Sequence, residues 1–465
     1  MLKIYNTLSR KKDEFKPLKG NKVNLFVCGP TIYDYAHIGH AKTYISFDAF
    51  AKYLKQKDFN VFYLQNITDI DDKIINRAKE KNMPVKKLAD EFEKEYLKDV
   101  KSIFITSVKK YEKATDNIKE IISQIKRMIE SGFAYKASDG VYFDISKFKN
   151  YGKLSKRTAL GAEDAVSRID DSKNKRNKGD FCLWKLSKDS EPKWESPWGD
   201  GRPGWHIEDT AITEKFFGPQ YDIHGGARDL IFPHHEAEIA EMESISGKSP
   251  LAKYWMHTGF LTVNGQKMSK SLNNFITIRD FISKNSPSLL RFMILKTLWH
   301  SPFDYSDKSL KESKAGLEKI EEFVRKISSV KNTSAKNGLI SQAVKKATDD
   351  FYRQLDDDFN TPNALAVIYD FIKEMNKLFD DKKISKKNAK EILSFIKKFN
   401  EIFNILDFKG ILKTPVSKEI KKLAAERKKA RKENNWQKSD ELRKQIEDKG
   451  YKIEDTQSGS VIRKI

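Results

Sequence analysis

Two histidines near the start of the chain could meet a triphosphate. They lie in His37-Ile38-Gly39-His40, shortly after an apolar stretch. Histidines three positions apart share one side of a helical turn, and at a helix N-terminus the backbone N–H groups would join them around phosphate oxygens. Gly39 would leave room for a nucleotide against the backbone. A chance match or a structural histidine pair is the alternative.

A second motif lies far along the chain. Lys267-Met268-Ser269-Lys270-Ser271 follows the turn signal Asn264-Gly265. The two lysines could neutralise the charge that develops on a triphosphate as pyrophosphate leaves, although a solvated basic loop is the plainer interpretation. In this order and separation, the two motifs resemble the paired signatures of class I aminoacyl-tRNA synthetases.

The elements that must position these motifs follow a strand–turn–helix–strand rhythm. Such a rhythm predicts a parallel sheet with its site at the strand ends. The expected strands are residues 23–28, 60–65 and 220–226, and the expected helices are residues 41–55 and 234–245. We therefore expect an α/β, Rossmann-like nucleotide-binding domain with an insertion, then an all-α bundle and a small basic module.

The expected division has five segments. It places the catalytic domain at 1–84 and 201–306, the insertion at 85–200, the helical bundle at 307–407 and the small module at 417–465. Apolar residues at helical spacing between 317 and 403 are expected to form the bundle core.

Composition narrows the partners and the compartment. The 465 residues carry a formal net charge of +22, from 88 Lys and Arg against 66 Asp and Glu. This excess fits a nucleic-acid partner or a surface of solvated lysines. The sequence shows no secretory signal pattern and no apolar run long enough to span a bilayer, and its two cysteines suggest no disulfide framework. We expect a cytoplasmic protein without a membrane partner.

Further motifs make the resemblance specific to the cysteinyl branch of class I. They are Cys28-Gly29-Pro30-Thr31-Ile32-Tyr33-Asp34, Asn66-Ile67-Thr68-Asp69-Ile70-Asp71-Asp72-Lys73, Gly204-Trp205-His206-Ile207-Glu208, Asp222-Ile223-His224-Gly225-Gly226, Phe232-Pro233-His234-His235-Glu236 and Asp358-Phe359-Asn360-Thr361-Pro362. The likeness extends over essentially the whole chain. It implies an enzyme that activates L-cysteine with ATP and Mg²⁺ and transfers it to tRNA(Cys), with a monomer as the expected state.

The resemblance also implies a zinc ion that ligates the substrate thiolate. Cys28, His234 and Glu238 match three of the family's ligand positions, and Asp209 stands where the family has a cysteine. Zinc accepts carboxylate oxygen, and aspartate keeps the charge of a thiolate. Serine would be a much poorer ligand than cysteine. The alternative is a site that recognises cysteine without metal.

Other roles follow from the same resemblance. Gly29 and Thr68 would line the cysteine pocket and Trp205 would wall it, while Asp229 would hold the substrate ammonium or a ribose. In the mechanism that this implies, the cysteine carboxylate attacks the α-phosphorus of ATP. The catalytic residues that stabilise the departing pyrophosphate are His37, His40, Lys267 and Lys270.

The basic module would read the anticodon. Trp436 offers a stacking face for an unpaired base, Asp440 and Asp455 could accept hydrogen bonds from base edges, and Arg427 could meet phosphate or a base. Without the resemblance, this segment is a charged helical hairpin.

Two rival functions remain. One is a related ATP-dependent ligase that joins cysteine to a small aminosugar; it resembles the synthetase without its anticodon module, so residues 417–465 argue against it. The other is a non-catalytic RNA-binding relative, which the intact motif residues His37 and Lys267 argue against.

Overall fold

The computed structural model describes residues 1–157, 172–269, 272–330, 338–413, 418–456 and 459–464. These form two compact units. The first comprises residues 1–323 and 330–405, and the second comprises residues 324–329 and 406–465.

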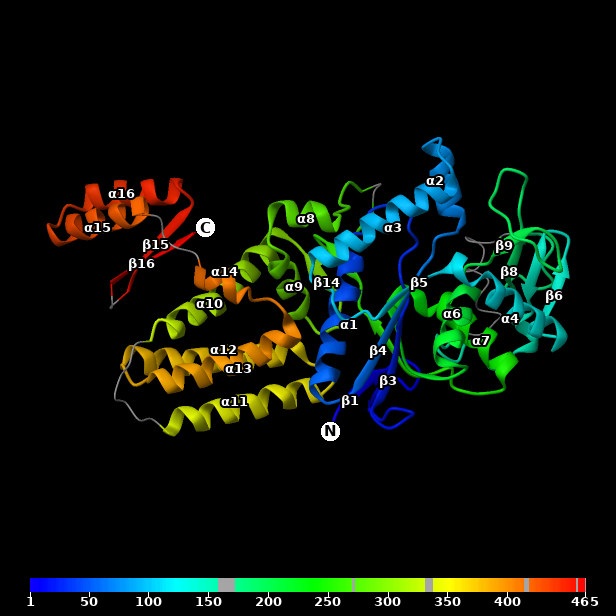
Figure 1. The fold of residues 1–465 in the computed structure, drawn as a ribbon, viewed down its shortest axis with the longest axis horizontal. Helices are drawn as coiled ribbons and strands as arrows, with labels where there is room; N and C mark the ends of the chain where they lie inside the picture. The colour runs from blue at the N-terminus through cyan, green and yellow to red at the C-terminus, as the bar shows by residue number, and fades with distance from the viewer. Residues whose placement is uncertain (158–171, 270–271, 331–337, 414–417, 457–458, 465) are drawn as a thin grey trace. The chain divides into compact units, whose positions relative to one another are not determined.

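A parallel sheet is the centre of the first unit. Its strand order is β11-β10-β3-β4-β5, and every neighbouring pair is parallel. The strands are β3 (Lys22–Val27), β4 (Asn60–Ile67), β5 (Lys110–Lys113), β10 (Tyr221–Ala227) and β11 (Ala252–Thr258). The long helix α1 (Ile38–Gln56) connects β3 to β4 (Figure 1). In the sheet, β3 and β10 are neighbours. From β3 the chain continues to β4, on the side of β3 away from β10, and from β10 it continues to β11, on the side of β10 away from β3. The carboxyl ends of β3 and β10 are therefore the topological switch point, where such sheets bind ligands.

An antiparallel sheet forms the body of the insertion. Its order is β6-β7-β8-β9, from β6 (Ala134–Ala137), β7 (Gly140–Phe143), β8 (Phe181–Leu186) and β9 (Gly201–Pro203). The structure differs from the expected boundaries at both ends of the insertion. Strand β5 lies within 85–200 but pairs with β4 in the parallel sheet, and β9 lies beyond residue 200 but pairs with β8.

Two helices lie between these sheets and belong to both cores. They are α6 (Ile207–Phe217) and α7 (His234–Ser246). Ala211 and Ala237 pack with the insertion strands, whereas Ile212 and Ile239 pack with Phe26 of the parallel sheet. Because both faces of each helix are covered, neither helix has the single apolar stripe of a surface helix.

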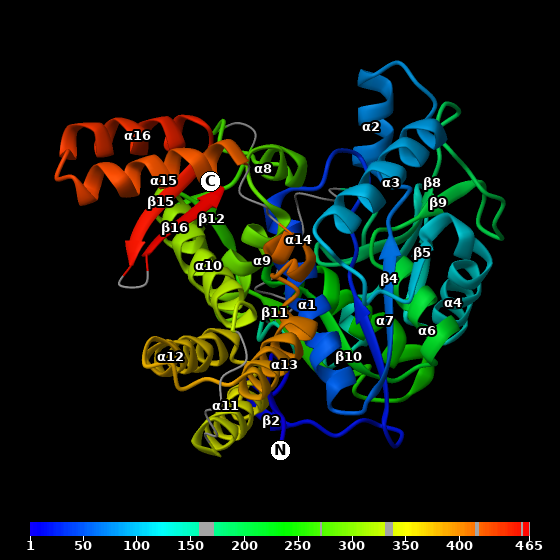
Figure 2. The ribbon, with the colours of Figure 1, turned by 60° about the vertical axis from the view of Figure 1, so that its left-hand side comes forward.

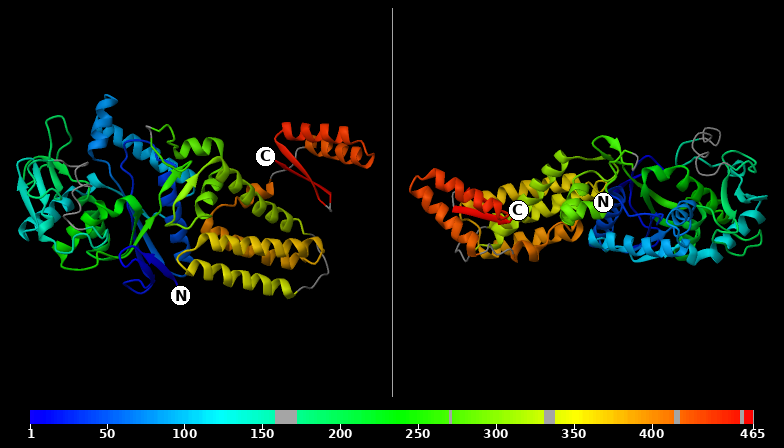
Figure 3. Two further views of the ribbon diagram at one scale, coloured as in Figure 1. Left: turned by 180° about the vertical axis from the view of Figure 1, so that it is seen from behind. Right: turned by 90° about the horizontal axis from the view of Figure 1, so that it is seen from above.

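Helices α2 (Asp72–Glu80), α3 (Val85–Ser102), α4 (Ile118–Glu130), α8 (Ile278–Lys284) and α9 (Pro287–Leu295) complete the α/β part. Short strands pair as β1 (Lys3–Asn6) with β2 (Lys11–Glu14), and as β12 (Leu261–Val263) with β13 (Gln266–Lys267) and β14 (Phe303–Tyr305). The helical part contains α10 (Asp307–Ser328), α11 (Gly338–Asp356), α12 (Thr361–Asp380) and α13 (Lys386–Phe403), of which α11 to α13 run side by side (Figure 3). No described helix combines the length and apolarity that a bilayer crossing needs.

The second unit ends in a helical hairpin and a β-hairpin. It contains α14 (Phe408–Lys413), α15 (Lys418–Lys432), α16 (Trp436–Asp448), β15 (Tyr451–Thr456) and β16 (Gly459–Lys464). The antiparallel strands β15 and β16 lie beside α15 and α16 (Figure 2). A small core of Ile420, Ala424, Ile446 and Ile453 joins them. The break between the helices falls at Asn434, whose φ is 54°.

A buried ion pair joins α9 to α1. Arg291 and Asp48 are both fully buried, with Nη2 of Arg291 2.8 Å from Oδ2 of Asp48. The guanidinium also donates to the carbonyls of Phe403 and Ile103, at 2.9 and 3.1 Å. Burial alone would raise the pKa of Asp48, but Arg291 and Lys52 outweigh it and hold that pKa below its ordinary value. This pair therefore connects the α/β part to the end of α13.

We predict that Arg291→Met destabilises the protein by about 3–5 kcal/mol, because the buried Asp48 carboxylate loses its fully buried cationic partner and keeps only its pairing with Lys52, which is 15% exposed. The measurement is the apparent free energy of unfolding from denaturant titration. Arg353→Met is the matched control, since Arg353 pairs with Asp350 on the surface of α11 and is 70% exposed; we expect a loss below about 1 kcal/mol. Equal losses in the two variants would contradict the role given to the buried pair.

Candidate active site

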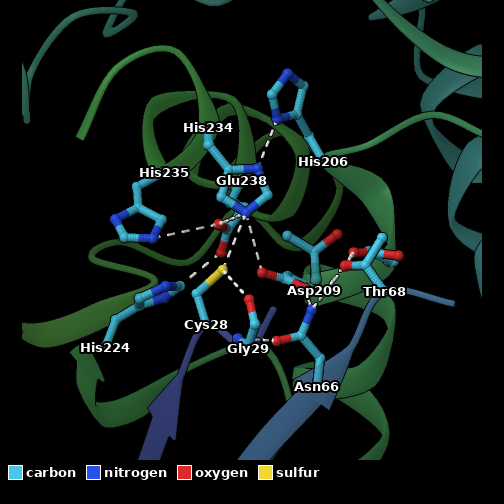
Figure 4. A network of polar contacts seen from close by, with 12 residues as sticks. Cys28, Gly29, Asn66, Thr68, His206, Asp209, His224, His234, His235 and Glu238 are labelled. Carbon is cyan, nitrogen blue, oxygen red and sulfur yellow. Dashed lines mark hydrogen bonds and ion pairs between the residues drawn. The ribbon is translucent and has the colours of Figure 1, made fainter. Parts of the chain in front are cut away.

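The four residues predicted to bind zinc meet at the switch point of the parallel sheet. Cys28 follows β3, Asp209 lies in the first turn of α6, and His234 and Glu238 lie one turn apart on α7. His234 is at the centre (Figure 4). Its Nε2 lies 3.6 Å from the Cys28 sulfur, 3.1 Å from Oδ2 of Asp209 and 3.3 Å from Oε1 of Glu238.

The cluster concentrates acidic groups away from solvent. Asp209 and Glu238 have no exposed surface, and Cys28 is only 7% exposed. Burial, followed by repulsion from Asp209 and Glu238, raises the pKa of the Cys28 thiol well above its ordinary value. Burial and then Asp209 raise the pKa of Glu238 in the same way. Among the described residues, neither carboxylate oxygen of Glu238 has a hydrogen-bond partner.

The ligand atoms of Asp209, His234 and Glu238 lie within 4.8 Å of one another, and so do those of Cys28, His234 and His235, so these residues could hold a metal ion. Zinc bonds of about 2.0–2.3 Å place adjacent tetrahedral ligand atoms about 3.3–3.8 Å apart. Of the three distances from Nε2 of His234, 3.3 and 3.6 Å lie within this range and 3.1 Å lies just below it. Sulfur, nitrogen and carboxylate oxygen are the ligand atoms that zinc takes. A cation here would also neutralise the buried carboxylates.

Sequence reasoning gave no role to the histidines that surround this cluster. Nδ1 of His206 and Nδ1 of His234 are 2.8 Å apart, so His206 holds the central imidazole in orientation. His224 Nδ1 lies 3.5 Å from Oε2 of Glu238, and His235 Nε2 lies 3.9 Å from Oε1 of the same carboxylate. Burial lowers the pKa of His206, His224 and His235 well below the ordinary value. In the sequence, the one sign that these histidines matter is that each belongs to a motif quoted above.

The predicted pocket residues lie beside the cluster. The Trp205 ring stacks on His234, with centroids 4.5 Å apart and planes at 21°. A Cβ at Gly29 would lie 1.8 Å from the carbonyl oxygen of Asn66, so only glycine fits there. Thr68 donates its hydroxyl to Glu208, and Asn66 donates to Oδ1 of Asp209. Asn66 and Glu208 are two more residues that sequence reasoning did not assign.

The first motif caps helix α1. Nδ1 of His37 accepts hydrogen bonds from the amides of Gly39 and His40, at 3.1 and 3.3 Å. These two N–H groups are therefore already paired, whereas we expected them to face phosphates. Burial lowers the pKa of His37 to about 4, and burial followed by His37 lowers the pKa of His40 well below its ordinary value. Both imidazoles are neutral at pH 7.

The two motifs lie together. A Cβ at Gly39 would lie 2.8 Å from the His37 ring and 3.6 Å from Cε of Met268. The segment after the second motif pairs with the first, since the amide of Ile38 donates to the carbonyl of Ile276 at 3.1 Å. Lys267 ends β13 with an exposed side chain.

Two further predicted residues are Lys270 and Asp229. Lys270 lies outside the described residues. Asp229 is exposed on the short helix Arg228–Ile231 after β10.

The predicted RNA-binding residues of the second unit differ in exposure. Trp436 is 56% exposed at the start of α16, and the guanidinium carbon of Arg431 lies 5.7 Å from its ring centroid. Asp440 is exposed on the same helix. Arg427, which we expected to meet phosphate or a base, is only 3% exposed. Asp455 lies on β15, and its side chain is outside the described part of the chain.

Comparison with known proteins gives full-length relatives. Residues 14–315 match the family described as "tRNA synthetases class I (C) catalytic domain", and residues 350–407 match "DALR domain". The chain is 42% identical to a cysteine–tRNA ligase of Thermococcus gammatolerans, covering 100% of this chain and 99% of the relative. It is 45% identical to the cysteine–tRNA ligase of Thermoplasma acidophilum, covering 98% of each.

Solved structures share the fold at low identity. The methionyl-tRNA synthetase of Mycobacterium tuberculosis in complex with methionyl-adenylate has a TM-score of 0.63 at 16% identity, covering 83% of this chain and 90% of that chain. An Agrobacterium radiobacter LeuRS in a ternary complex with tRNA and LeuAMS has a TM-score of 0.62 at 11% identity, covering 87% and 86%. These likenesses support the α/β catalytic fold.

We predict that His37→Asn distinguishes the role of His37 as the N-cap of α1 from a role in adenylate formation. Asparagine is a strong N-cap and should preserve the stability of α1, whereas His37→Ala should cost about 1 kcal/mol. If the imidazole contacts the reacting phosphates, His37→Asn should still slow ATP–pyrophosphate exchange about 10²-fold. The measurements are the thermal midpoint and the exchange rate. Full exchange activity in the asparagine variant would mean that His37 is only a cap.

We also predict that stability falls as the pH is lowered from 6.5 toward 5. Burial lowers the pKa of His37 to about 4 and that of His257 to about 3, so neither is protonated in the folded state over this interval. The unfolded chain does take up these protons, because its histidines titrate near 6.5. Proton uptake by the unfolded state favours unfolding. The raised pKa of Glu238 acts in the opposite direction, but the lowered pKa values of the other buried histidines reinforce the effect. The thermal midpoint against pH checks this, and a flat profile between pH 6.5 and 5 would contradict it.

Proposed function

The chain belongs to the cysteine–tRNA ligase family of class I tRNA synthetases, and we propose that its buried cluster around His234 binds the substrate cysteine through a zinc ion. As a member of this family it is an enzyme that uses ATP with Mg²⁺ to activate L-cysteine and transfers it to tRNA(Cys). The resemblance found in the sequence is thereby confirmed, and neither the aminosugar ligase nor the non-catalytic binder is favoured.

The observation that carries the zinc proposal is the position of one atom. Nε2 of His234 lies within 3.6 Å of a sulfur and of two carboxylate oxygens, all from buried side chains. Cys28, Asp209, His234 and Glu238 would hold the ion. When bound, zinc lowers the pKa of the substrate thiol and takes its sulfur as a ligand, which serine cannot match.

The surrounding residues would shape the cysteine pocket. Trp205, stacked on His234, closes one side of the cluster against water. Gly29 lets the chain approach Asn66, and Thr68 is held by Glu208. The cysteine carboxylate would then attack the α-phosphorus of ATP in line, and pyrophosphate would leave. His37, His40, Lys267 and Lys270 are proposed to stabilise the charge on the departing group.

The second unit is proposed to bind the anticodon region of the tRNA. The support is the exposed Trp436 ring, beside Arg431 and on the same helix as Asp440. Aromatic faces near cations are the usual means of holding unpaired bases. Arg427 is also proposed to take part in tRNA binding, from a position where only 3% of the residue is exposed. We further propose that the protein is a monomer and that it is cytoplasmic; two free cysteines are consistent with a reducing compartment.

The function itself is tested by cysteine-dependent ATP–pyrophosphate exchange and by charging of a tRNA(Cys) transcript. An RNA-binding protein without activity would fail the first assay. A ligase for another acceptor would pass the first and fail the second.

We predict about one zinc per chain, and a loss of that zinc in Asp209→Ala, as measured by inductively coupled plasma mass spectrometry on purified protein. Asp209→Cys should retain the ion, because a thiolate replaces the carboxylate. Glu241→Gln is the control: this buried carboxyl lies on α7 and accepts a hydrogen bond from Thr210, outside the proposed ligand set. If Asp209→Ala keeps its zinc, Asp209 is not a ligand. If wild-type protein that contains no zinc still activates cysteine, the proposal of a zinc ion is wrong.

A further inference from the structure

A cleft of about 340 Å³ lies close to the proposed cysteine site. It is lined by Tyr33, Asp34, Lys73, Asn76, Arg77 and Glu80. The first two residues follow Cys28 at the carboxyl end of β3, and the other four lie on α2, which follows β4. Because β3 and β4 are adjacent parallel strands, the cleft opens at the same edge of the sheet as the cluster around His234.

Lys73 connects the cleft to the cysteine pocket. Its Nζ lies 5.8 Å from the centroid of the Tyr33 ring and 5.9 Å from the centroid of the Trp205 ring. Trp205 in turn stacks on the proposed zinc ligand His234. A group that occupied this cleft would therefore be next to the residue that walls the cysteine pocket.

The two cations of the cleft differ in their partners. Arg77 lies 2.9 Å from a carboxylate oxygen of Glu80 and 3.9 Å from one of Asp34. Lys73 is exposed, and within the part of the chain that the structure describes no carboxylate pairs with it. Its charge is therefore available to an anion from outside the chain.

We propose that this cleft binds the single-stranded 3′ end of the tRNA, with Lys73 contacting a backbone phosphate and Tyr33 presenting its ring to a base. The inference rests on the proposed function and deepens it. The terminal ribose must reach the carbonyl of the activated cysteine, so the nucleotides that precede it must lie beside the cysteine pocket. An unpaired cation next to an aromatic face is the combination that holds single-stranded RNA.

The size of the cleft agrees with this occupant. A volume of about 340 Å³ is at the lower end of the roughly 300–1,000 Å³ of ligand sites, which suits one nucleotide at a time and not a folded helix. The lining holds two carboxylates, Asp34 and Glu80, and two cations; Arg77 lies near both carboxylates, so Lys73 is the cation that can turn to a ligand.

The test compares two RNAs on the full-length protein. One is a tRNA(Cys) transcript, and the other is the same transcript without its terminal CCA. Lys73→Met should weaken binding of the intact transcript about tenfold and reduce the slope of log affinity against log salt by about 0.7, the value for one lost single-strand phosphate contact. Binding of the truncated transcript should not change. Lys73→Arg should bind both RNAs as the wild type does, because arginine also contacts phosphate.

Lys79→Met is the matched control. Lys79 is another exposed lysine of α2 that does not line the cleft, so any general loss of positive charge should affect both RNAs equally and slightly. Equal weakening of both transcripts by Lys73→Met, or no change with either, would overturn the proposal.

Exchange and transfer rates distinguish this proposal from the proposed function. Pyrophosphate exchange requires no RNA, so Lys73→Met should slow transfer of cysteine to tRNA far more than it slows exchange. A proportional loss of exchange would place Lys73 in adenylate formation and overturn its role at the RNA end. If the wild-type protein shows no cysteine-dependent exchange, the proposed function fails, whatever the two RNAs show.

Discussion

Burial of negative charge around one imidazole is the constraint on which the site depends. Asp209 and Glu238 have no exposed surface, Cys28 is almost as deeply buried, and all three face Nε2 of His234. A protein does not keep such groups ionised in its interior without a compensating cation or protons. The raised pKa values of Cys28 and Glu238 are the response of the protein alone. A bound zinc ion would provide the same compensation with the groups deprotonated, which is the state that can select a thiol.

The fold makes this burial feasible. Helices α6 and α7 supply three of the four residues, and both helices are packed between the parallel sheet and the insertion sheet. Asp209 and His234 lie in the first turns of their helices, at the carboxyl edge of the sheet where Cys28 ends β3. The insertion therefore closes the site as well as extending the chain.

The sequence predicted the parallel sheet and the residues of the cluster because both leave local signals. Alternation between apolar strands and helices identified β3, β4 and β10, and the resemblance to the cysteinyl branch of class I pointed to Cys28, Asp209 and His234. The roles of His206, His224 and Asn66 could not be predicted, because each depends on contacts between segments far apart in the chain. The same limit applies to β5, whose membership of the main sheet depends on pairing with β4 and not on its four residues. The burial of Arg427 likewise depends on packing that its basic neighbours do not reveal.

The aspartate at position 209 is held in a way that a cysteine could not be. Its Oδ2 faces His234, while Oδ1 accepts a hydrogen bond from the amide of Asn66. The carbonyl oxygen of the Asn66 side chain accepts a hydrogen bond from the amide of Gly29, at 2.5 Å. One side chain thus orients the carboxylate and fixes the backbone of the cysteine pocket. Because the second carboxylate oxygen is already occupied, Asp209 would offer the ion one oxygen, which is the same number of ligand atoms as the thiolate it replaces. If zinc binds as proposed, oxygen in place of sulfur at this position would preserve the ligand count and the charge, and Asn66 would link the ion to the proposed substrate pocket.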